Sequence, residues 1–408
     1  MTDAAECDTA APPGAIQAAM PAGTSPPAIQ PFRAGLGAAP GKLGAGGLPP
    51  GVLLPPLTLR GLRNPRYALN TAAGRWLLLA FLPGAAAGTA LEMALAPHRP
   101  LFDDRHAALF AITARPEDLP EGRLRDQLPG LRALADESGG AFAACGFDPA
   151  HGGLLLLDPM LRVVEAAPLG GAAALLARLA ALPPPERHAG MEIPAPVLVL
   201  PRVLEPELCE RLIILHQQDG GQPSGFMREV SGRTVLVQDP AHKRRSDLML
   251  RDPALLATLR ARIATRIVPA MRLAFQFEAT RIERFVVSCY DSAERGHFRA
   301  HRDNTLAGTA HRRFAVTVNL NAEGFEGGEL NFPEFGPRLH RAPTGGAVIF
   351  SCSLLHEARP VTRGRRYAFL PFLYDEAAAR LRERNQHLVG PLPESAPPAA
   401  TAPVPEPA

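Results

Sequence analysis

The stretch GHFRAHRDNT, residues 296–305, holds two histidines, two arginines and an aspartate. His301 and Asp303 lie two positions apart within it. On a β-strand alternate side chains point to the same face, so both could reach one point in space. An imidazole and a carboxylate are common metal ligands, but a His-x-Asp pair alone also fits a charged turn at the surface. The stretch therefore suggests a metal site, and further ligand residues elsewhere in the sequence are needed to support it.

A candidate third ligand follows a later apolar run. His356 comes soon after residues 347–352, a run typical of a buried strand, and an antiparallel double sheet can place it opposite His301. Two histidines and one carboxylate form the facial triad that suits non-haem iron(II) and leaves coordination positions open. Arg366 lies in the next expected strand. Its guanidinium could pair bidentately with the far carboxylate of a dicarboxylate that binds iron at its other end.

Nearby basic residues leave alternatives open. His297 would share a face with His301 on a regular strand, although no acidic residue lies two positions after it. Arg365 competes with Arg366, but alternation puts the two on opposite faces, and Arg302 would face away from the ligands beside it. The ligand candidates also keep a simpler interpretation, as a surface ion pair and a hydrogen-bonded core histidine. A further histidine among arginines, at position 311, is expected to be solvated.

Residues 190–388 are dense in expected strands. The apolar runs predict strands at 197–200, 281–290, 297–303, 312–320, 328–332, 346–352 and 366–373. Helical spacing of apolar residues predicts helices at 205–218, 253–275 and 375–386. Many strands joined by Gly- and Asn-rich turns are typical of a sandwich or barrel of jelly-roll type.

Several motifs follow one another in this block. They are Val286–Tyr290 (VVSCY), His301–Asp303 (HRD), Val318–Asn321 (VNLN), Gly327–Leu330 (GGEL), Pro343–Phe350 (PTGGAVIF), His356 and Pro360–Tyr367 (PVTRGRRY). In order and spacing they resemble the 2-oxoglutarate- and iron(II)-dependent oxygenases, in their prolyl 4-hydroxylase-like branch. The resemblance covers residues 196–375. A His-x-Asp pair is a weak signal by itself, whereas the whole series is specific.

The resemblance implies a role for each of five residues. The iron ligands would be His301, Asp303 and His356. Arg366 would pair with the distal carboxylate of 2-oxoglutarate, and Tyr290 would hydrogen-bond the same cosubstrate. The fold would be a double-stranded β-helix with flanking helices. The family binds Fe(II), 2-oxoglutarate and O2, converts the oxoacid to succinate and hydroxylates an unactivated C–H bond. A prolyl or other amino-acid side chain in a peptide or protein is the expected substrate, and ascorbate as a reductant stays open.

Residues 57–182 alternate apolar strand-like runs with helical stretches, which favours an α/β sandwich. The block resembles, more faintly, the thioredoxin-like fold of the peroxiredoxins. That family places a threonine and a cysteine after a proline, whereas here Pro83 is followed by Gly84 and the cysteine-free stretch Ala85–Ala90. The resemblance implies a thioredoxin-like domain without peroxidase activity. The expected elements are strands at 75–81, 107–113, 153–159 and 162–165 and helices at 128–137 and 169–182.

Composition sets the expected domain bounds. Residues 1–55 are mainly Ala, Pro and Gly with few large apolar side chains, and residues 389–408 have the same character. Such segments bury too little surface to offset the entropy of ordering, so both are expected to be disordered. Between them we expect the thioredoxin-like domain at 57–182, a Pro-rich linker at 183–195 and the dioxygenase domain at 196–388.

Length, net charge and cysteine content limit the kinds of partner and the cellular compartment to be expected. The chain has 408 residues, 46% of them hydrophobic, and a net charge of +3, too slight to indicate nucleic acid binding. The one tight basic cluster, Lys243-Arg244-Arg245, is expected on a solvated face, and a contact with nucleic acid or an anionic substrate is the alternative. No signal peptide and no apolar run of bilayer length is visible, so no membrane association is expected. Five scattered cysteines argue against a disulfide framework and suit a reducing cytoplasm. A homodimer stays open.

Two other classes of function compete with the hydroxylase. A thiol-dependent redox protein would act through the first block, but the missing cysteine argues against it, and Cys145 is expected to be structural. A non-catalytic jelly-roll module that binds a metal is the second alternative. The complete triad together with Arg366 argues against this module, because a protein without turnover has no use for a cosubstrate arginine.

Overall fold

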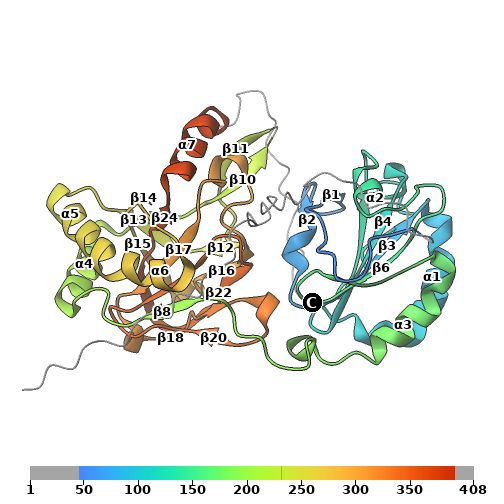
Figure 1. Ribbon diagram of the computed structural model, residues 1–408, viewed down its shortest axis with the longest axis horizontal. Helices are drawn as coiled ribbons and strands as arrows, with labels where there is room; N and C mark the ends of the chain where they lie inside the picture. Colours follow the sequence, from blue (N-terminus) through green and yellow to red (C-terminus); the bar gives the residue numbers. More distant parts are fainter. Residues whose placement is uncertain (1–45, 231, 391–408) are drawn as a thin grey trace, which may run out of the picture. The chain divides into compact units, whose positions relative to one another are not determined.

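The computed structural model describes residues 46–230 and 232–390 (Figure 1). Within these ranges a block of mixed α/β structure is followed by a block rich in β-strands. Of the disorder predicted for residues 1–55 and 389–408, the parts at 1–45 and 391–408 fall outside the described residues. In the part of the chain that is described, no helix is both long enough and apolar enough to cross a bilayer.

Residues 46–55 correct the predicted N-terminal boundary. Leu48 and Leu54 are buried in a core of the first block. The backbone N–H of Gly51 donates to the carbonyl of Val163 at 2.7 Å. The Pro- and Gly-rich composition hid this packing, because two leucines and a few backbone hydrogen bonds are enough to hold a short segment. Ordered structure therefore begins before the predicted domain.

The first block contains one mixed sheet. Its strands are β1 (Thr58–Gly61), β2 (Tyr67–Ala68), β3 (Trp76–Leu82), β4 (Ala107–Thr113), β5 (Leu131–Ala135), β6 (Gly153–Leu157) and β7 (Val163–Ala167). The order across the sheet is β2-β1-β5-β4-β3-β6-β7. β3, β4 and β5 pair in parallel, whereas β6 and β7 add to the β3 edge antiparallel. The sequence predicted β3, β4, β6 and β7 as strands.

Three helices pack on this sheet: α1 (Gly88–Leu95), α2 (Gly140–Ala144) and α3 (Ala172–Ala180). β3 is buried along its whole length, and its alternate residues enter two different cores. Leu77 and Leu79 share a core with Phe142 of α2. Leu78 packs on the other face with Leu175 of α3. Burial on both faces explains the continuous apolar run. The thioredoxin-like assignment stays a prediction.

The helix predicted at 128–137 is wrong, because this segment contains strand β5. β5 pairs in parallel with β4, and its residues are almost all buried. A short apolar run buried on both faces cannot be distinguished from a buried helix by periodicity. Gly130 marks the entry to the strand, with φ of 94° and a position at which a Cβ would lie 1.8 Å from the carbonyl oxygen of Phe102. That close approach admits only glycine.

The second block contains two larger sheets and a hairpin. Its strands are β8 (Leu198–Leu200), β9 (Gln222–Pro223), β10 (Phe226–Val230), β11 (Arg233–Val237), β12 (Lys243–Arg244), β13 (Ser246–Met249), β14 (Arg281–Glu283), β15 (Val286–Asp291), β16 (His297–His301), β17 (Phe314–Asn319), β18 (Phe325–Gly327), β19 (Leu330–Asn331), β20 (Leu339–His340), β21 (Ala347–Ser351), β22 (His356–Ala358), β23 (Val361–Phe369) and β24 (Phe372–Tyr374). The major sheet runs β14-β24-β17-β23-β15-β13-β9, with β21 joining β17 to β8. The minor sheet runs β12-β16-β22-β19-β20.

Side chains of both sheets meet in one core. Tyr290 and Phe372 from the major sheet pack in the same cluster as Leu330 and Ala358 from the minor sheet. Pairing within each sheet is antiparallel throughout. Two antiparallel sheets with a shared interior are the jelly-roll architecture that the sequence predicted.

Helices cover the outer face of the major sheet. They are α4 (Pro206–Asp219), α5 (Pro253–Arg262) and α6 (Val268–Phe275), and a last helix is α7 (Glu376–Asn385). The single helix predicted at 253–275 is interrupted by a π-helical segment, Ile263–Ile267. Pro269 lacks a backbone N–H for the α-helical ladder, which accounts for the interruption. The predicted apolar stripe is nevertheless buried, at Leu255, Leu259, Ile263, Ile267 and Met271.

Candidate metal centre

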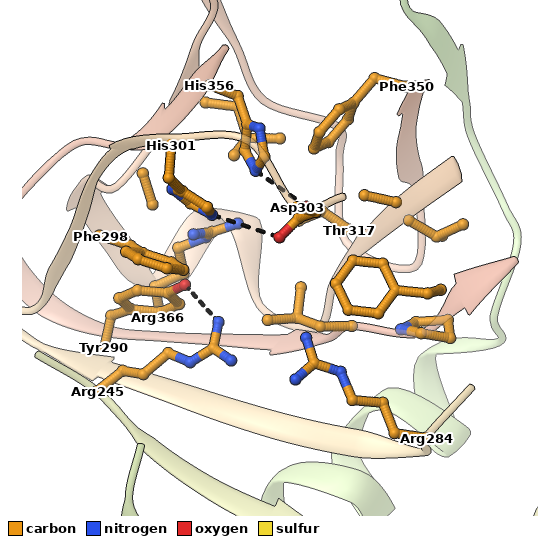
Figure 2. A pocket seen from close by; sticks show the side chains of 17 residues that line it. Arg245, Arg284, Tyr290, Phe298, His301, Asp303, Thr317, Phe350, His356 and Arg366 are labelled. Carbon is orange, nitrogen blue, oxygen red and sulfur yellow. Dashed lines mark hydrogen bonds and ion pairs between the residues drawn. The ribbon is translucent and has the colours of Figure 1, made fainter. Parts of the chain in front are cut away.

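Strand pairing brings together two histidines that are distant in the sequence. β16 and β22 run antiparallel in the minor sheet, and their register places His301 directly opposite His356. Directly opposed residues of an antiparallel pair project from the same face. The centroids of the two imidazole rings are 4.3 Å apart. Both rings point toward Asp303 in the interior of the block (Figure 2).

Asp303 completes a cluster with these histidines. One of its carboxylate oxygens lies 3.5 Å from Nε2 of His301, and the other lies 3.3 Å from Nε2 of His356. One ligand atom from each side chain falls within 4.8 Å of the other two. Over residues 46–230 and 232–390, this is the only group of three such side chains close enough to share a metal ion.

Hydrogen bonds orient both imidazoles. Nδ1 of His301 donates to the carbonyl of Arg299 at 2.7 Å, and Nδ1 of His356 donates to the carbonyl of Leu354 at 3.0 Å. Because a carbonyl only accepts, the proton of each neutral ring belongs on Nδ1, and Nε2 presents its lone pair. The ring of Phe298 stacks on His301 with centroids 3.5 Å apart. Two oriented imidazoles and a carboxylate fit a divalent first-row metal with open positions.

Burial and nearby charge set the protonation states of the cluster. Burial lowers the pKa of His301 to about 4, and the charge of His356 acts in the same direction. Burial would raise the pKa of Asp303, but the two histidines outweigh it and hold that pKa well below its ordinary value. At neutral pH the cluster therefore offers a carboxylate beside a neutral imidazole, the states in which these groups bind metals.

The cluster opens into a pocket that both sheets line (Figure 2). Tyr290 and Arg366 are direct partners in the β15–β23 pairing, and both line this pocket. Arg366 is only 2% exposed, and its Cζ lies 5.0 Å from the centroid of the Tyr290 ring. Nη1 of Arg245 donates to the Tyr290 hydroxyl oxygen at 2.9 Å. All five residues singled out from the sequence thus meet at one pocket.

Gly327 and Gly328 shape the turn beside Arg366. Both have positive φ, 72° and 70°. A Cβ on Gly327 would lie 2.3 Å from the carbonyl oxygen of Pro360, and a Cβ on Gly328 would lie 3.0 Å from Cδ of Arg366. The glycines of the GGEL motif therefore leave room for the backbone of one strand and for the arginine stem.

His297 lies outside the cluster. Its Nδ1 faces the carbonyl of Arg295 at 2.9 Å, and its Nε2 faces the carbonyl of Ala241 at 3.2 Å. The β16–β22 pairing is irregular between Phe298 and His301, so simple alternation does not hold along this strand. The irregularity is why His297 and His301 do not share a face.

Arg302 and Arg365 do not line the pocket, as alternation predicts. Arg365 is exposed. Arg302 donates to both carboxylate oxygens of Glu334, at 3.0 and 2.8 Å. Glu334 also accepts the backbone N–H of Leu355 at 2.8 Å. Because Leu355 adjoins His356, this ion pair links the two segments that carry the histidines.

The basic cluster Lys243-Arg244-Arg245 is not a solvated face, contrary to the prediction. Arg244 is exposed, but Lys243 and Arg245 are only 6% and 8% exposed. Nε of Arg245 lies 2.9 Å from a carboxylate oxygen of Asp247, and Arg245 lines the pocket. A run of like charges hid the alternation of the strand. The available signal was the carboxylate two positions after Arg245.

Arg284 is a second pocket residue that sequence reasoning missed. The predicted strand at 281–290 is interrupted at this residue, whose φ is 52°. It lines the same pocket as Arg366. A non-glycine residue in the left-handed region leaves no mark in the apolar pattern, so nothing in the sequence pointed to it.

Glu283 binds two basic side chains beside the pocket. Its carboxylate accepts from Nε2 of His311 at 2.8 Å and from Nε and Nη2 of Arg312 at 2.9 and 2.7 Å. His311 is only 3% exposed, so the prediction that it is solvated is wrong. The arginine next to it is also buried, and the shared carboxylate explains why both can be.

We expect Glu283→Gln to destabilise the fold at pH 7 and to do so less in acid. Burial opposes ionisation of Glu283, but hydrogen bonds from His311 and Arg312 outweigh it, so its folded pKa lies below the ordinary value of 4.5. A lowered folded pKa stabilises the fold above pH 4.5, and this contribution is lost as the pH falls further. Urea unfolding should show a loss of about 3 kcal/mol at pH 7.

The matched control is Glu376→Gln. Glu376 pairs with Arg281 at 2.8 Å, but both side chains are about half exposed, so we expect little change. A deficit of Glu283→Gln that stays constant from pH 7 to below pH 4.5 would contradict the assignment of charge to this carboxylate.

Comparison with known proteins assigns a family to this geometry. The family model described as the 2OG-Fe(II) oxygenase superfamily matches residues 285–374, which include all three clustered side chains and Arg366. A PKHD-type hydroxylase of Verminephrobacter eiseniae is 30% identical over 159 residues, which cover 33% of this chain and 69% of that protein. The chain belongs to the 2OG-Fe(II) oxygenase superfamily.

A second relative and a solved structure are also similar to parts of the chain. A PKHD-type hydroxylase of a Synechococcus strain is 33% identical over 93 residues, 21% of this chain and 41% of that protein. The chain thus spans about two fifths of that relative's length. A solved prolyl hydroxylase from Trichoplax adhaerens, in complex with a hypoxia inducible factor peptide fragment, covers 45% of this chain and 86% of its own at 16% identity and a TM-score of 0.35.

Proposed function

We propose that this chain is an iron(II)- and 2-oxoglutarate-dependent dioxygenase that hydroxylates an unactivated C–H bond while 2-oxoglutarate becomes succinate. One observation carries the proposal: His301, Asp303 and His356 cluster in the same pocket as a buried arginine, Arg366. Membership of the superfamily supports the cofactor and the cosubstrate. We further propose that the hydroxylated group is a prolyl or other amino-acid side chain in a peptide or protein.

The three clustered residues would hold the iron through Nε2 of each histidine and a carboxylate oxygen of Asp303. When bound, iron(II) supplies the one-electron chemistry by which oxygen attacks a C–H bond. The hydrogen bonds on Nδ1 of His301 and His356 keep their Nε2 atoms turned toward Asp303. The rings of Phe298 and Phe350 line the pocket on either side and help to exclude water.

Arg366 would bind the distal carboxylate of 2-oxoglutarate. Its Nε is buried, and no described residue provides it with a hydrogen-bond partner. A buried guanidinium gains most from a carboxylate, which it can bind bidentately. The hydroxyl oxygen of Tyr290 accepts from Arg245, so its own O–H remains a donor. We propose that Tyr290 donates this hydrogen bond to the same carboxylate.

We propose the domain division 57–182, 183–195 and 196–388, with residues 46–55 added to the first domain, on the basis of composition and of the two groups of sheets. A thioredoxin-like role for the first domain is also a proposal.

Thiol chemistry is the weaker candidate for the function of the first domain. Cys145 is fully buried, and burial raises the pKa of its thiol to about 12, with Asp136 acting in the same direction. A thiol of that kind is protonated at neutral pH and is a poor nucleophile.

The proposed function is tested by adding iron(II) and then 2-oxoglutarate to the full chain without oxygen. We expect a weak visible charge-transfer band, which reports chelation of the iron by the oxoacid. Admission of oxygen should then release succinate, measured by NMR. A wild-type protein that binds iron but gives no band would overturn the proposal. Consumption of peroxide that is lost in Cys145→Ser would instead favour the thiol alternative.

A further inference from the structure

Arg284 contributes a guanidinium to the pocket from outside the family motifs. The residue lies between β14 and β15 of the major sheet, with φ of 52°. A residue with a Cβ is strained in the left-handed region, so the surrounding fold must impose the turn. That turn directs the side chain into the pocket, where its guanidinium faces the same space as that of Arg245 (Figure 2).

The guanidinium of Arg284 has no anionic partner among the described residues. Its Nε is buried without a hydrogen-bond partner. The adjacent carboxylate, Glu283, is already taken by His311 and Arg312. The contact that remains is with the ring of Phe372, whose centroid lies 4.5 Å from Cζ of Arg284. Among the described residues, the direct contact of this positive charge is thus with an aromatic ring, and the carboxylates of Asp247 and Glu283 act on it only at longer range.

A cation–π contact does not balance this burial. Arg284 is half-buried with its Nε shielded from solvent, and a cation–π contact is weaker than the ion pair that a charge in such a place usually has. Arg312 also lies over the Phe372 ring, at 4.2 Å, but it is neutralised by Glu283. Burial lowers the pKa of Arg284 to about 10, and Arg312 acts in the same direction, yet the group stays charged at pH 7. An anion from outside the chain would remove the imbalance.

The other two arginines of the pocket have different assignments. Arg245 is paired with Asp247 and donates to Tyr290. Arg366 is the arginine proposed for the distal carboxylate of 2-oxoglutarate. One dicarboxylate cosubstrate, bound to the metal at one end and to Arg366 at the other, therefore leaves Arg284 without a partner. The pocket holds one more cationic group than the cosubstrate requires.

We propose that Arg284 binds a carboxylate of the primary substrate, the molecule that is hydroxylated. The inference rests on the proposed function and sharpens it. The substrate would carry a free carboxylate close to the oxidised carbon, either an α-carboxylate or the side chain of an acidic residue. An internal prolyl residue of a peptide has no such group and would leave Arg284 unpaired. Arg284 is thus a specificity residue, distinct from the metal ligands.

The test uses acetate as the probe and acetamide as its neutral counterpart. The full chain is saturated with Zn(II), which replaces iron without redox chemistry, and with 2-oxoglutarate, which occupies Arg366. Isothermal titration should then detect binding of acetate but not of acetamide. In Arg284→Gln the affinity for acetate should fall about 10-fold or more. The affinity for 2-oxoglutarate should stay within about 3-fold, and Arg284→Lys should recover part of the acetate binding.

Several outcomes would overturn the assignment. These are no acetate binding to the wild type, equal binding to Arg284→Gln, or a loss of 2-oxoglutarate affinity in Arg284→Gln as large as that in Arg366→Gln. Failure of the proposed function is recognised separately, because the wild type would not bind 2-oxoglutarate. In that case acetate binding is measured in Arg366→Gln without 2-oxoglutarate, so that Arg366 cannot be the group that binds acetate. Circular dichroism of each variant excludes unfolding as the cause.

Competition against acetate identifies the source of the carboxylate. N-acetylglycine offers the carboxylate on the backbone, and N-acetyl-aspartic acid α-amide offers it on a side chain. Displacement by the first supports a free amino acid or a C-terminal residue as the substrate. Displacement by the second supports an acidic residue within a peptide. If neither displaces acetate, the proposal that an amino-acid carboxylate binds at Arg284 is wrong.

Discussion

Replacing Asp303 by alanine is expected to abolish the visible band of the iron(II)–2-oxoglutarate complex and the formation of succinate. Asp303 is the only carboxylate of the cluster, and its two oxygens approach Nε2 of both histidines. Without it, two imidazoles remain to hold a divalent cation. Iron affinity, measured by equilibrium dialysis, should fall by more than about 100-fold, because removing even a partner of a ligand costs about 10- to 100-fold.

The matched control for this change is Asp219→Ala. Asp219 is an exposed carboxylate at the end of α4 and is not among the residues that line the pocket. We expect it to bind iron and 2-oxoglutarate as the wild type does. Circular dichroism and thermal unfolding of Asp303→Ala should show an intact fold. An intact band in a folded Asp303→Ala protein would refute the assignment of the metal ligands.

Replacing Arg366 by glutamine is expected to weaken the binding of 2-oxoglutarate and to leave iron binding unchanged. The guanidinium is buried and lies beside Tyr290, so the cosubstrate carboxylate would lose its charged partner in a site that excludes water. Truncating one member of a buried charge pair costs about 2–5 kcal/mol, which is about 30-fold or more in the dissociation constant. Titration of the visible band with 2-oxoglutarate measures the change.

The adjacent residue supplies the control for this prediction. Arg365→Gln removes the same chemical group one position away, but that side chain is exposed and pairs with Asp291 at 2.7 Å. It should bind 2-oxoglutarate like the wild type. Arg366→Lys should lie between the two, because an ammonium keeps the charge but not the bidentate geometry. Equal effects of Arg365→Gln and Arg366→Gln would mean that the pocket arginine has been misassigned.

Much of the candidate site could be predicted because its residues follow simple strand rules. The side chains of His301 and Asp303 lie two positions apart on one segment, and that spacing identified them. The choice of Arg366 over Arg365 needed only alternation along a strand. His356 was harder, since its place opposite His301 depends on the register between β16 and β22. The order and spacing of the sequence motifs indicated the position of His356 indirectly.

The parts that could not be predicted depend on contacts between distant segments. Arg245 was expected to be solvated because its tyrosine partner becomes visible only when β13 and β15 lie side by side, and the local signal, Asp247 two positions later, was overlooked. Arg284 depends on a local backbone turn with no sequence signature. Strand β5 was mistaken for a helix because burial on both faces removes the alternation that marks a strand. For Arg245 and β5 long-range packing overrides the local pattern, whereas Arg284 was missed because its backbone turn has no sequence signature.

The ion pair between Arg302 and Glu334 has a consequence for engineering. It ties the segment that carries His301 and Asp303 to the backbone of Leu355, which precedes His356. The distance between the ligand-bearing segments is therefore fixed by Arg302 and Glu334, which do not line the pocket. Side chains that line the pocket can then be varied to accept new substrates, while the Arg302–Glu334 ion pair keeps the ligand-bearing segments in place. A library for altered substrate selectivity should therefore vary the side chains that line the pocket and keep Arg302 and Glu334 unchanged.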